Sequence, residues 1–92
     1  MNYNISASML FSDTLVPDIF IKEYLPMLDG DSVKIYLYCL FLSQKKDCSI
    51  EAVKRIFGYD DEYLKQCFNQ LSNLGLISVK TKRIIVCDIK EK

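Results

Sequence analysis

The sequence predicts a mainly α-helical domain that carries one small β-hairpin. Two apolar stripes with helical spacing flank a glycine-containing turn within residues 49–77, which is the pattern of a helix-turn-helix. After residue 76 the apolar spacing changes to the alternation of strands, interrupted by a polar turn. A helix-turn-helix followed by a hairpin is a winged helix. We therefore expect a winged helix-turn-helix with an N-terminal strand and helix extension.

Length and composition limit what this chain can be. Its 92 residues suffice for one domain, in which we expect the extension at 1–28, the helical core with the helix-turn-helix at 29–76 and the wing hairpin at 77–90. Half of the residues are hydrophobic, so either the core is well filled or some apolar surface is reserved for a partner. Twelve basic residues balance twelve acidic ones, which argues against a purely electrostatic DNA clamp. No apolar run approaches the roughly 20 residues of a membrane span, so we expect a cytoplasmic protein.

The first residues alternate in the manner of a strand with one apolar side. That side consists of Ile5, Ala7, Met9 and Phe11. An isolated strand leaves backbone groups unpaired, so we expect it to pair with the wing of its own domain or with another chain. The alternative is a disordered tail.

A short helix should follow, with Pro17 as its first residue and Pro26 as its limit. Proline suits the first helical turn because its missing N–H has no partner there in any helix. We expect this helix and the two residues after Pro26 to bury an apolar stripe of Phe20, Ile21, Tyr24, Leu25, Met27 and Leu28.

Residues 32–44 form the second predicted helix, capped by Asp31 or Ser32, and this helix is apolar on more than one face. One face comprises Val33, Tyr36, Leu37, Leu40 and Phe41, and the other comprises Ile35, Tyr38, Cys39 and Leu42. One face can pack on the helix-turn-helix, and the other must meet the N-terminal segment, a second subunit, or both. We therefore predict a homodimer or higher oligomer whose interface includes Ile5, Met9, Phe11, Ile35, Tyr38 and Leu42.

The ends of the helix-turn-helix are specified by capping residues. Ser49 is the expected N-cap of the first helix, and Gly58 ends that helix because glycine tolerates the left-handed conformation. Asp60 is the expected N-cap of the second helix and Gly75 its stop. In such a glycine stop the residue after the glycine folds back on the last helical turn, here on Leu71.

The second helix of the motif would be the one that enters the major groove of DNA. It begins with the carboxylates of Asp60, Asp61 and Glu62, which repel phosphates. Its candidate base contacts are Lys65, Gln66 and Asn69, since amides can read adenine. A solvated surface or a protein interface is the alternative role, and the one we favour.

The predicted wing carries a small cluster of basic residues, which makes it the candidate site for contact with the DNA backbone. Its members are Lys80, Lys82 and Arg83. A turn that faces water is often charged without any function, so both interpretations stay open.

No catalytic, metal or cofactor site is predicted, and we do not expect an enzyme. The sequence has no histidine and no glycine-rich phosphate loop. Its four cysteines, which form no CxxC, are expected to be reduced and mostly buried. They are Cys39, Cys48, Cys67 and Cys87.

The segment TLVPDIFIKEYLPML at residues 14–28, with Pro17 and Tyr24, resembles the N-terminal domain of the DnaD family of bacterial replication-initiation proteins. The apolar helix, the helix-turn-helix and the LGLI stop follow with matching spacing, so the resemblance covers residues 12–78. It implies an oligomerising winged-helix domain, joined to a C-terminal DNA-binding domain and acting in primosome assembly and helicase loading. Nothing like that second domain follows here, so the family's DNA-remodelling activity is not implied.

Two functions are therefore weighed from the sequence. The first is an oligomerisation and interaction domain of a replication-initiation protein, with itself and other initiation proteins as partners and at most weak, non-specific DNA contact. The second is a winged-helix transcriptional regulator that reads DNA.

Overall fold

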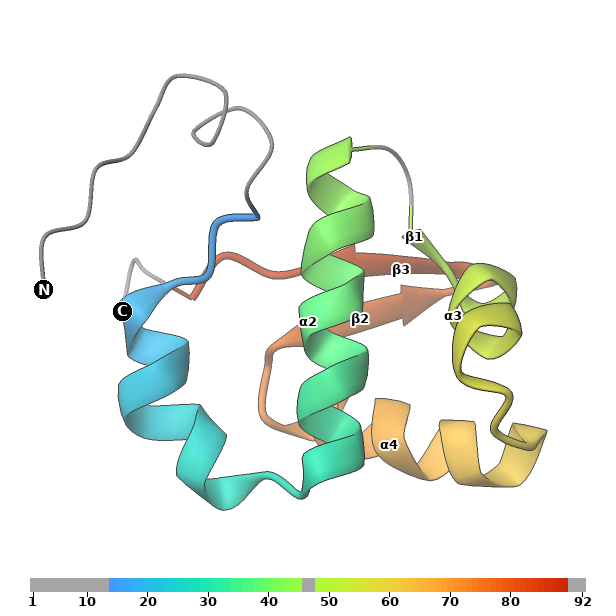
Figure 1. The fold of residues 1–92 in the computed structure, drawn as a ribbon, viewed down its shortest axis with the longest axis horizontal. Helices are drawn as coiled ribbons and strands as arrows, with labels where there is room; N and C mark the ends of the chain where they lie inside the picture. The colour runs from blue at the N-terminus through green and yellow to red at the C-terminus, as the bar shows by residue number, and fades with distance from the viewer. Residues whose placement is uncertain (1–13, 46–47, 90–92) are drawn as a thin grey trace, which may run out of the picture.

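The computed structural model describes residues 14–45 and 48–89. One helix, α2 (Gly30–Lys45), forms the centre of the domain, and α3 (Ile50–Phe57), α4 (Asp61–Asn73) and a small sheet lie around it (Figure 1). The sheet is antiparallel with strand order β1-β3-β2, and its strands are β1 (Cys48–Ser49), β2 (Ile77–Lys80) and β3 (Arg83–Val86). The predicted fold class, a mainly helical winged helix-turn-helix, is thus confirmed.

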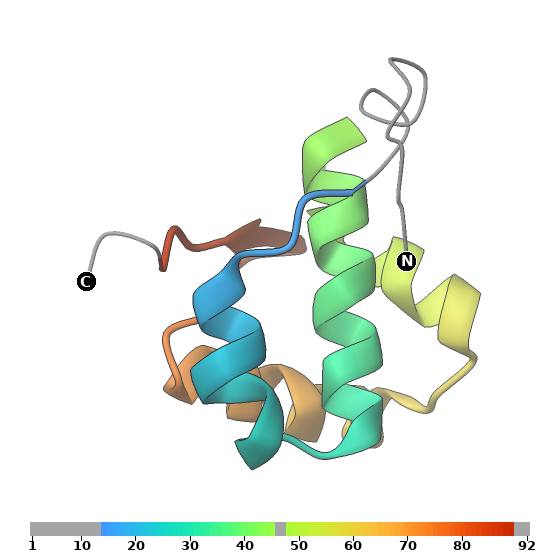
Figure 2. The same cartoon turned by 60° about the vertical axis from the view of Figure 1, so that its left-hand side comes forward.

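Residues 14–29 form an extension along one side of α2 (Figure 2). A helical turn begins at Asp18, one residue after the predicted start at Pro17, and continues as the π-helix η1 (Phe20–Tyr24) and the short 3₁₀ helix η2 (Leu25–Met27). Phe20 is fully buried, and its ring stacks on that of Tyr36 in α2 with 4.3 Å between centroids. The extension therefore contributes to the core of the domain.

The predicted apolar stripe of this extension is largely wrong. Phe20 is buried and Tyr24 half-buried, but Ile21, Leu25 and Met27 are exposed. The reason is the wide π turn, in which the Leu25 N–H donates to the Phe20 carbonyl, followed by a tight 3₁₀ turn. Residues spaced for an α-helix no longer share one side in such a segment. Pro26 lies within η2 and does not end it.

α2 begins two residues earlier than predicted, and its cap is Asp29 in place of Asp31 or Ser32. The Asp29 carboxylate accepts a hydrogen bond from the Ser32 N–H at 2.8 Å, and its carbonyl accepts one from the Val33 N–H at 3.1 Å. The carboxylate thereby satisfies one of the N–H groups that the first helical turn leaves without a helical partner. This cap frees the Asp31 side chain for contacts elsewhere.

The outward face of α2 also differs from the prediction. Ile35 and Leu42, expected at an interface with another subunit, are 0% and 4% exposed and belong to the core. Leu37 and Phe41 are the exposed pair, at 39% and 38%. The helix is flanked by the extension on one side and α3 on the other, which leaves a narrow outer stripe with Leu37 and Phe41 one turn apart.

The capping predictions for the helix-turn-helix are confirmed. The Ser49 hydroxyl accepts from the Ala52 N–H at 3.1 Å, and Gly58 closes α3 in the left-handed conformation, at φ 71°. Asp60 caps α4, and Gly75 follows it at φ 78°. The residue after Gly75 folds back as expected, because the Leu76 N–H donates to the Leu71 carbonyl at 3.0 Å and both side chains are fully buried.

The wing hairpin is present as predicted, but the sheet has a third strand that the sequence did not indicate. Strands β2 and β3 pair from Ile77↔Val86 to Lys80↔Arg83 around a two-residue turn. In this turn Thr81 has φ 58°, a conformation that a β-branched residue rarely adopts. The added strand, β1, spans only two residues, too few for any alternation to be recognisable.

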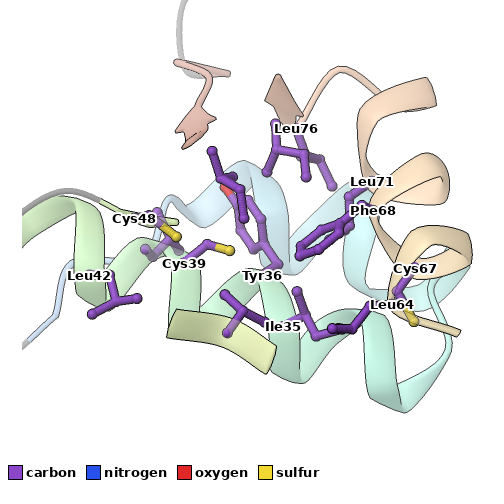
Figure 3. Packing of buried hydrophobic residues seen from close by; sticks show 14 of the residues in the cluster. Ile35, Tyr36, Cys39, Leu42, Cys48, Leu64, Cys67, Phe68, Leu71 and Leu76 are labelled. Atoms are coloured by element: carbon purple, nitrogen blue, oxygen red, sulfur yellow. The ribbon is translucent and has the colours of Figure 1, made fainter. Parts of the chain in front are cut away.

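One continuous core joins these elements. In Figure 3, side chains from α2 interdigitate with those from α4, and Leu76 and Cys48 lie at its edges. Tyr36 is fully buried within it, and its hydroxyl has no hydrogen-bond partner among the described residues. This burial raises the pKa of Tyr36 to about 12. Within the described ranges, none of the helices combines the length and apolar character that crossing a membrane requires.

Candidate nucleic-acid and protein interface

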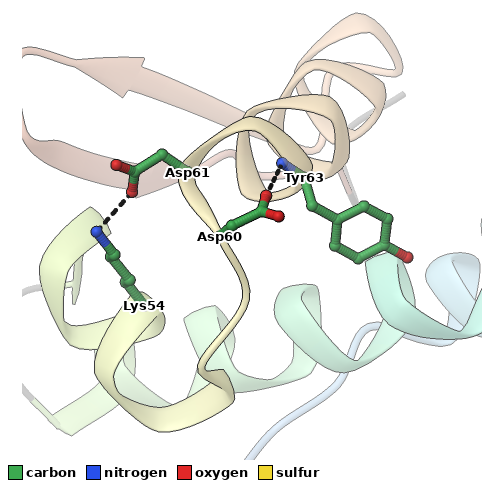
Figure 4. Close-up of polar contacts among 4 residues, drawn as sticks. All are labelled: Lys54, Asp60, Asp61 and Tyr63. Atoms are coloured by element: carbon green, nitrogen blue, oxygen red, sulfur yellow. Dashed lines mark hydrogen bonds and ion pairs between the residues drawn. The ribbon is translucent and has the colours of Figure 1, made fainter.

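The start of α4, where a DNA-reading helix would meet the bases, is acidic and already engaged within the domain. The Asp60 carboxylate accepts from the Tyr63 N–H at 2.8 Å, and Asp61 forms an ion pair of 2.6 Å with Lys54 of α3 (Figure 4). The hydrogen bond and charge of Asp61 raise the pKa of Lys54. Glu62 is exposed beside them. The ion pair therefore neutralises Lys54, a basic residue of the motif that could otherwise contact a DNA phosphate.

A carboxylate with two tyrosine partners fastens this motif to α2. The hydroxyl of Tyr59, in the turn, donates to Asp31 at 2.9 Å, and the hydroxyl of Tyr63, on α4, donates to the other oxygen of the same carboxylate. The bonds from Tyr63 and Tyr59 lower the pKa of Asp31, and they raise the pKa of both tyrosines. The sequence does not indicate this cluster, because its three members come from different elements and no spacing links them.

The candidate base contacts lie on the outer surface of α4. Lys65, Gln66 and Asn69 are all exposed. Gln66 and Asn69 line an open hollow of about 460 Å³ that also includes Asp29, whose carboxylate disfavours an approaching phosphate. Gln70, which also lines the hollow, accepts a hydrogen bond at its Oε1 from the Ser32 hydroxyl at 2.7 Å. The hollow offers amides for hydrogen bonding but no cation to hold a DNA backbone.

The basic cluster of the wing is exposed, but its turn is fixed to the rest of the domain. Lys80, Lys82 and Arg83 are all exposed at the hairpin end. The carbonyl of Lys82 accepts from the Ile50 N–H at 3.0 Å, which holds the turn against the start of α3. A hollow of about 370 Å³ beside it is lined by two cations and two carboxylates, together with Ile50: Lys54, Lys82, Glu51 and Asp61. The local field on the α3 side of the wing is therefore mixed.

The predicted oligomer-interface residues are only partly available for contact. Ile5, Met9 and Phe11 lie outside the described residues. Ile35 and Leu42 are buried in the core, as described above, and Tyr38 is half-buried with its ring 5.5 Å from Phe41 and 5.7 Å from Phe57. The large apolar side chains that α2 exposes are instead Leu37 and Phe41, which the sequence pattern assigned to the inner face.

All four cysteines are free thiols, and three of them are buried, as expected. Cys39 and Cys48 lie near each other in the core (Figure 3), and the hydrogen bond between the two thiols together with burial raises the pKa of Cys39. Burial also raises the pKa of Cys67. The raised pKa values keep Cys39 and Cys67 protonated at neutral pH. No group of side chains able to hold a metal ion occurs within residues 14–45 and 48–89.

Comparisons with known proteins add nothing to the geometry. The chain matches no protein-family model, no curated protein and no solved structure.

Proposed function

We propose that this winged helix is a self-associating interaction domain of a DNA replication-initiation protein, with at most weak, non-specific contact to DNA. The observation that carries the proposal is the acidic start of α4. Asp60, Asp61 and Glu62 occupy the place where a DNA-reading winged helix presents its base contacts, and the nearest cation, Lys54, is paired with Asp61.

The charge distribution argues against tight DNA binding. Proteins that bind duplex DNA through its backbone commonly make about 6–10 phosphate contacts with Lys and Arg. Besides Lys54, which is paired with Asp61, the motif and wing of this domain offer Arg55, Lys65 and the wing cluster of Lys80, Lys82 and Arg83, and carboxylates lie beside Lys65 and the wing cluster. This number of cations supports weak binding that does not depend on sequence.

The exposed stripe of α2 supports self-association. Leu37 and Phe41 lie one turn apart on the outer face of a helix whose other sides are covered. A two-fold dimer in which each α2 stripe packs on its counterpart would bury both side chains. The replication context comes from the resemblance of residues 14–28 to the DnaD family, and oligomers would raise the effective concentration of any attached DNA-binding domain at an origin.

Light scattering after size exclusion tests self-association of the 92-residue chain. We expect the wild type to show more than one subunit mass and the double variant Leu37→Glu/Phe41→Glu to show a lower mass at unchanged helicity. The matched control is Ile56→Glu, which places the same charge at an exposed apolar position on α3, at 55% exposure, and should keep the wild-type mass. A wild type that stays monomeric at high micromolar concentration contradicts the proposal.

The second candidate function, a DNA-reading regulator, is favoured by the exposed wing cations and the amides of α4. A salt titration on arbitrary and selected duplexes separates the two. Under our proposal Lys82→Ala/Arg83→Ala weakens binding to every duplex and flattens its salt dependence, whereas Gln66→Ala/Asn69→Ala has little effect. Loss of binding to one preferred sequence in the amide variant would establish the regulator instead.

A further inference from the structure

We propose that the free edge of β2, with the apolar groove beside it, receives residues 4–11 of a second copy of this chain as an added strand. The inference rests on the self-association proposed above and names a docking surface and the segment that occupies it.

The hairpin register shows which backbone groups of β2 point to the free edge. Around a two-residue turn the closing pair, here Lys80↔Arg83, exchanges both of its hydrogen bonds within the ladder. The bond from the Cys87 N–H to the Leu76 carbonyl, at 2.9 Å, has the same parity. The N–H and C=O groups of Ile77 and Val79 consequently point away from β3. Since β2 is the last strand of the sheet, no strand pairs with these groups in the described part of the chain.

An apolar groove runs beside this edge. Its cavity volume is about 390 Å³, and its apolar lining joins α3, α4 and β2 through Ile50, Leu64, Phe68 and Val79. Val79 is 39% exposed, so its side chain is available to a partner. The polar lining combines Asp61, Lys65 and Asn69, one negative, one positive and one neutral group. An extended, uncharged segment with apolar residues on one side fits this surface, in the manner of a peptide that adds a strand to an exposed sheet edge.

The N-terminal segment of the chain has that pattern. Residues 5, 7, 9 and 11 are Ile, Ala, Met and Phe, and they alternate with Ser6, Ser8 and Leu10. The first charged side chain of the sequence is Asp13, so the segment brings no side-chain charge into the groove. Its eight residues extend over roughly 26 Å at about 3.3 Å per residue, enough to pass the whole of β2.

The position of residues 14–17 favours docking on a second copy. Leu15 is tied to Gln44 of α2 by two hydrogen bonds, of 2.9 and 2.7 Å, and it lines a hollow together with Cys87 and Ile89. In Figure 1 this segment lies on one side of α2 and the hairpin turn lies on the other. The Leu15 side chain is 73% exposed, the most of any large hydrophobic residue described, so the chain presents it away from its own domain. Reciprocal exchange between two copies gives a closed two-fold dimer with both edges covered.

Paired single variants test the docking surface. Met9→Asp places a charge on the apolar side of the segment, and Val79→Lys places one at the groove. Each should weaken dimerisation at least about tenfold, because an unpaired charge enters an apolar contact. The matched controls are Ser8→Asp, on the other side of the segment, and Ile85→Lys, at a comparably exposed residue on the neighbouring strand that does not line the groove. Both controls should keep the wild-type mass, and thermal melts should show that all four proteins fold.

Mixing the two weakened variants, at a concentration where each alone is mostly monomeric, then distinguishes exchange between copies from pairing within one chain. In an equimolar mixture one site joins the new carboxylate to the new ammonium, and the other site has the wild-type pair. We expect dimer mass to return in the mixture alone, measured by light scattering.

Three results would overturn the inference. If the wild type is a dimer but neither Met9→Asp nor Val79→Lys changes its mass, the docking surface is wrong and self-association stands. If both single variants dissociate but their mixture stays monomeric, the surface does not bind a second copy in the proposed way. If the wild type is a monomer whose Val79 amide is protected from hydrogen exchange, the segment pairs within its own chain, and the proposed self-association fails as well.

Discussion

Replacing Phe20 by alanine should destabilise the whole domain, because the N-terminal extension shares its core. The side chain is fully buried and stacks on Tyr36 at 4.3 Å. Truncating a buried phenylalanine to alanine costs about 3–5 kcal/mol, part of which here is the loss of an aromatic pair. Domains of this kind have a free energy of unfolding of roughly 5–15 kcal/mol. At about 4 °C or more per kcal/mol, the midpoint of thermal unfolding should fall by at least about 12 °C.

Urea titration and thermal melts followed by circular dichroism measure this effect. The control is Ile21→Ala, the neighbouring residue at 52% exposure, which should change stability by less than about 0.5 kcal/mol. A loss below about 1 kcal/mol for Phe20→Ala would refute the reasoning, since it would mean that residues 14–29 are an appended segment outside the cooperative core.

Three further predictions concern single side chains. Asp31→Asn should destabilise the domain at neutral pH, and the difference from the wild type in urea titrations should shrink as pH falls. The Tyr63 and Tyr59 hydroxyls lower the pKa of Asp31 in the folded protein. The ionised carboxylate therefore stabilises the fold fully above the pKa of the unfolded chain, about 3.8, and this stabilisation is lost as pH falls through the pKa of the folded protein. Persistence of the difference at the lowest pH, or the same pH dependence in Tyr59→Phe/Tyr63→Phe, would contradict this. Tyr36→Phe should raise the free energy of unfolding by up to about 1 kcal/mol, because it removes a buried hydroxyl that has no hydrogen-bond partner among the described residues. If the substitution instead lowers the free energy of unfolding by more than about 1 kcal/mol, the hydroxyl does have a hydrogen-bond partner. Thr81→Gly should relieve the strain of the positive φ of 58°, which raises the free energy of unfolding by roughly 0.5–1 kcal/mol and with it the midpoint of thermal unfolding. The control Thr81→Ala keeps a Cβ and should give no gain. Equal effects of the two substitutions would exclude backbone strain.

The candidate site was only partly predictable. The acidic start of α4 and the exposed wing cations follow from the order of residues, because caps and turns act within a few positions. The ion pair of Lys54 with Asp61 and the convergence of two tyrosines on Asp31 depend on how three elements meet. A local sequence pattern therefore cannot predict these contacts.

The sequence by itself determined the local features of this protein. The helix ends at Ser49, Gly58, Asp60 and Gly75, the presence of a hairpin after α4 and the fold class all follow from short-range preferences for capping, positive φ and apolar spacing. Only the tertiary structure decided which apolar residues face outward. α2 is apolar nearly all round, so its pattern is compatible with several orientations, and the packing of the extension and α3 on its flanks turns Leu37 and Phe41 outward and buries Ile35 and Leu42. The strand β1 likewise exists because β3 lies beside it, since two residues carry no preference strong enough to form a strand alone.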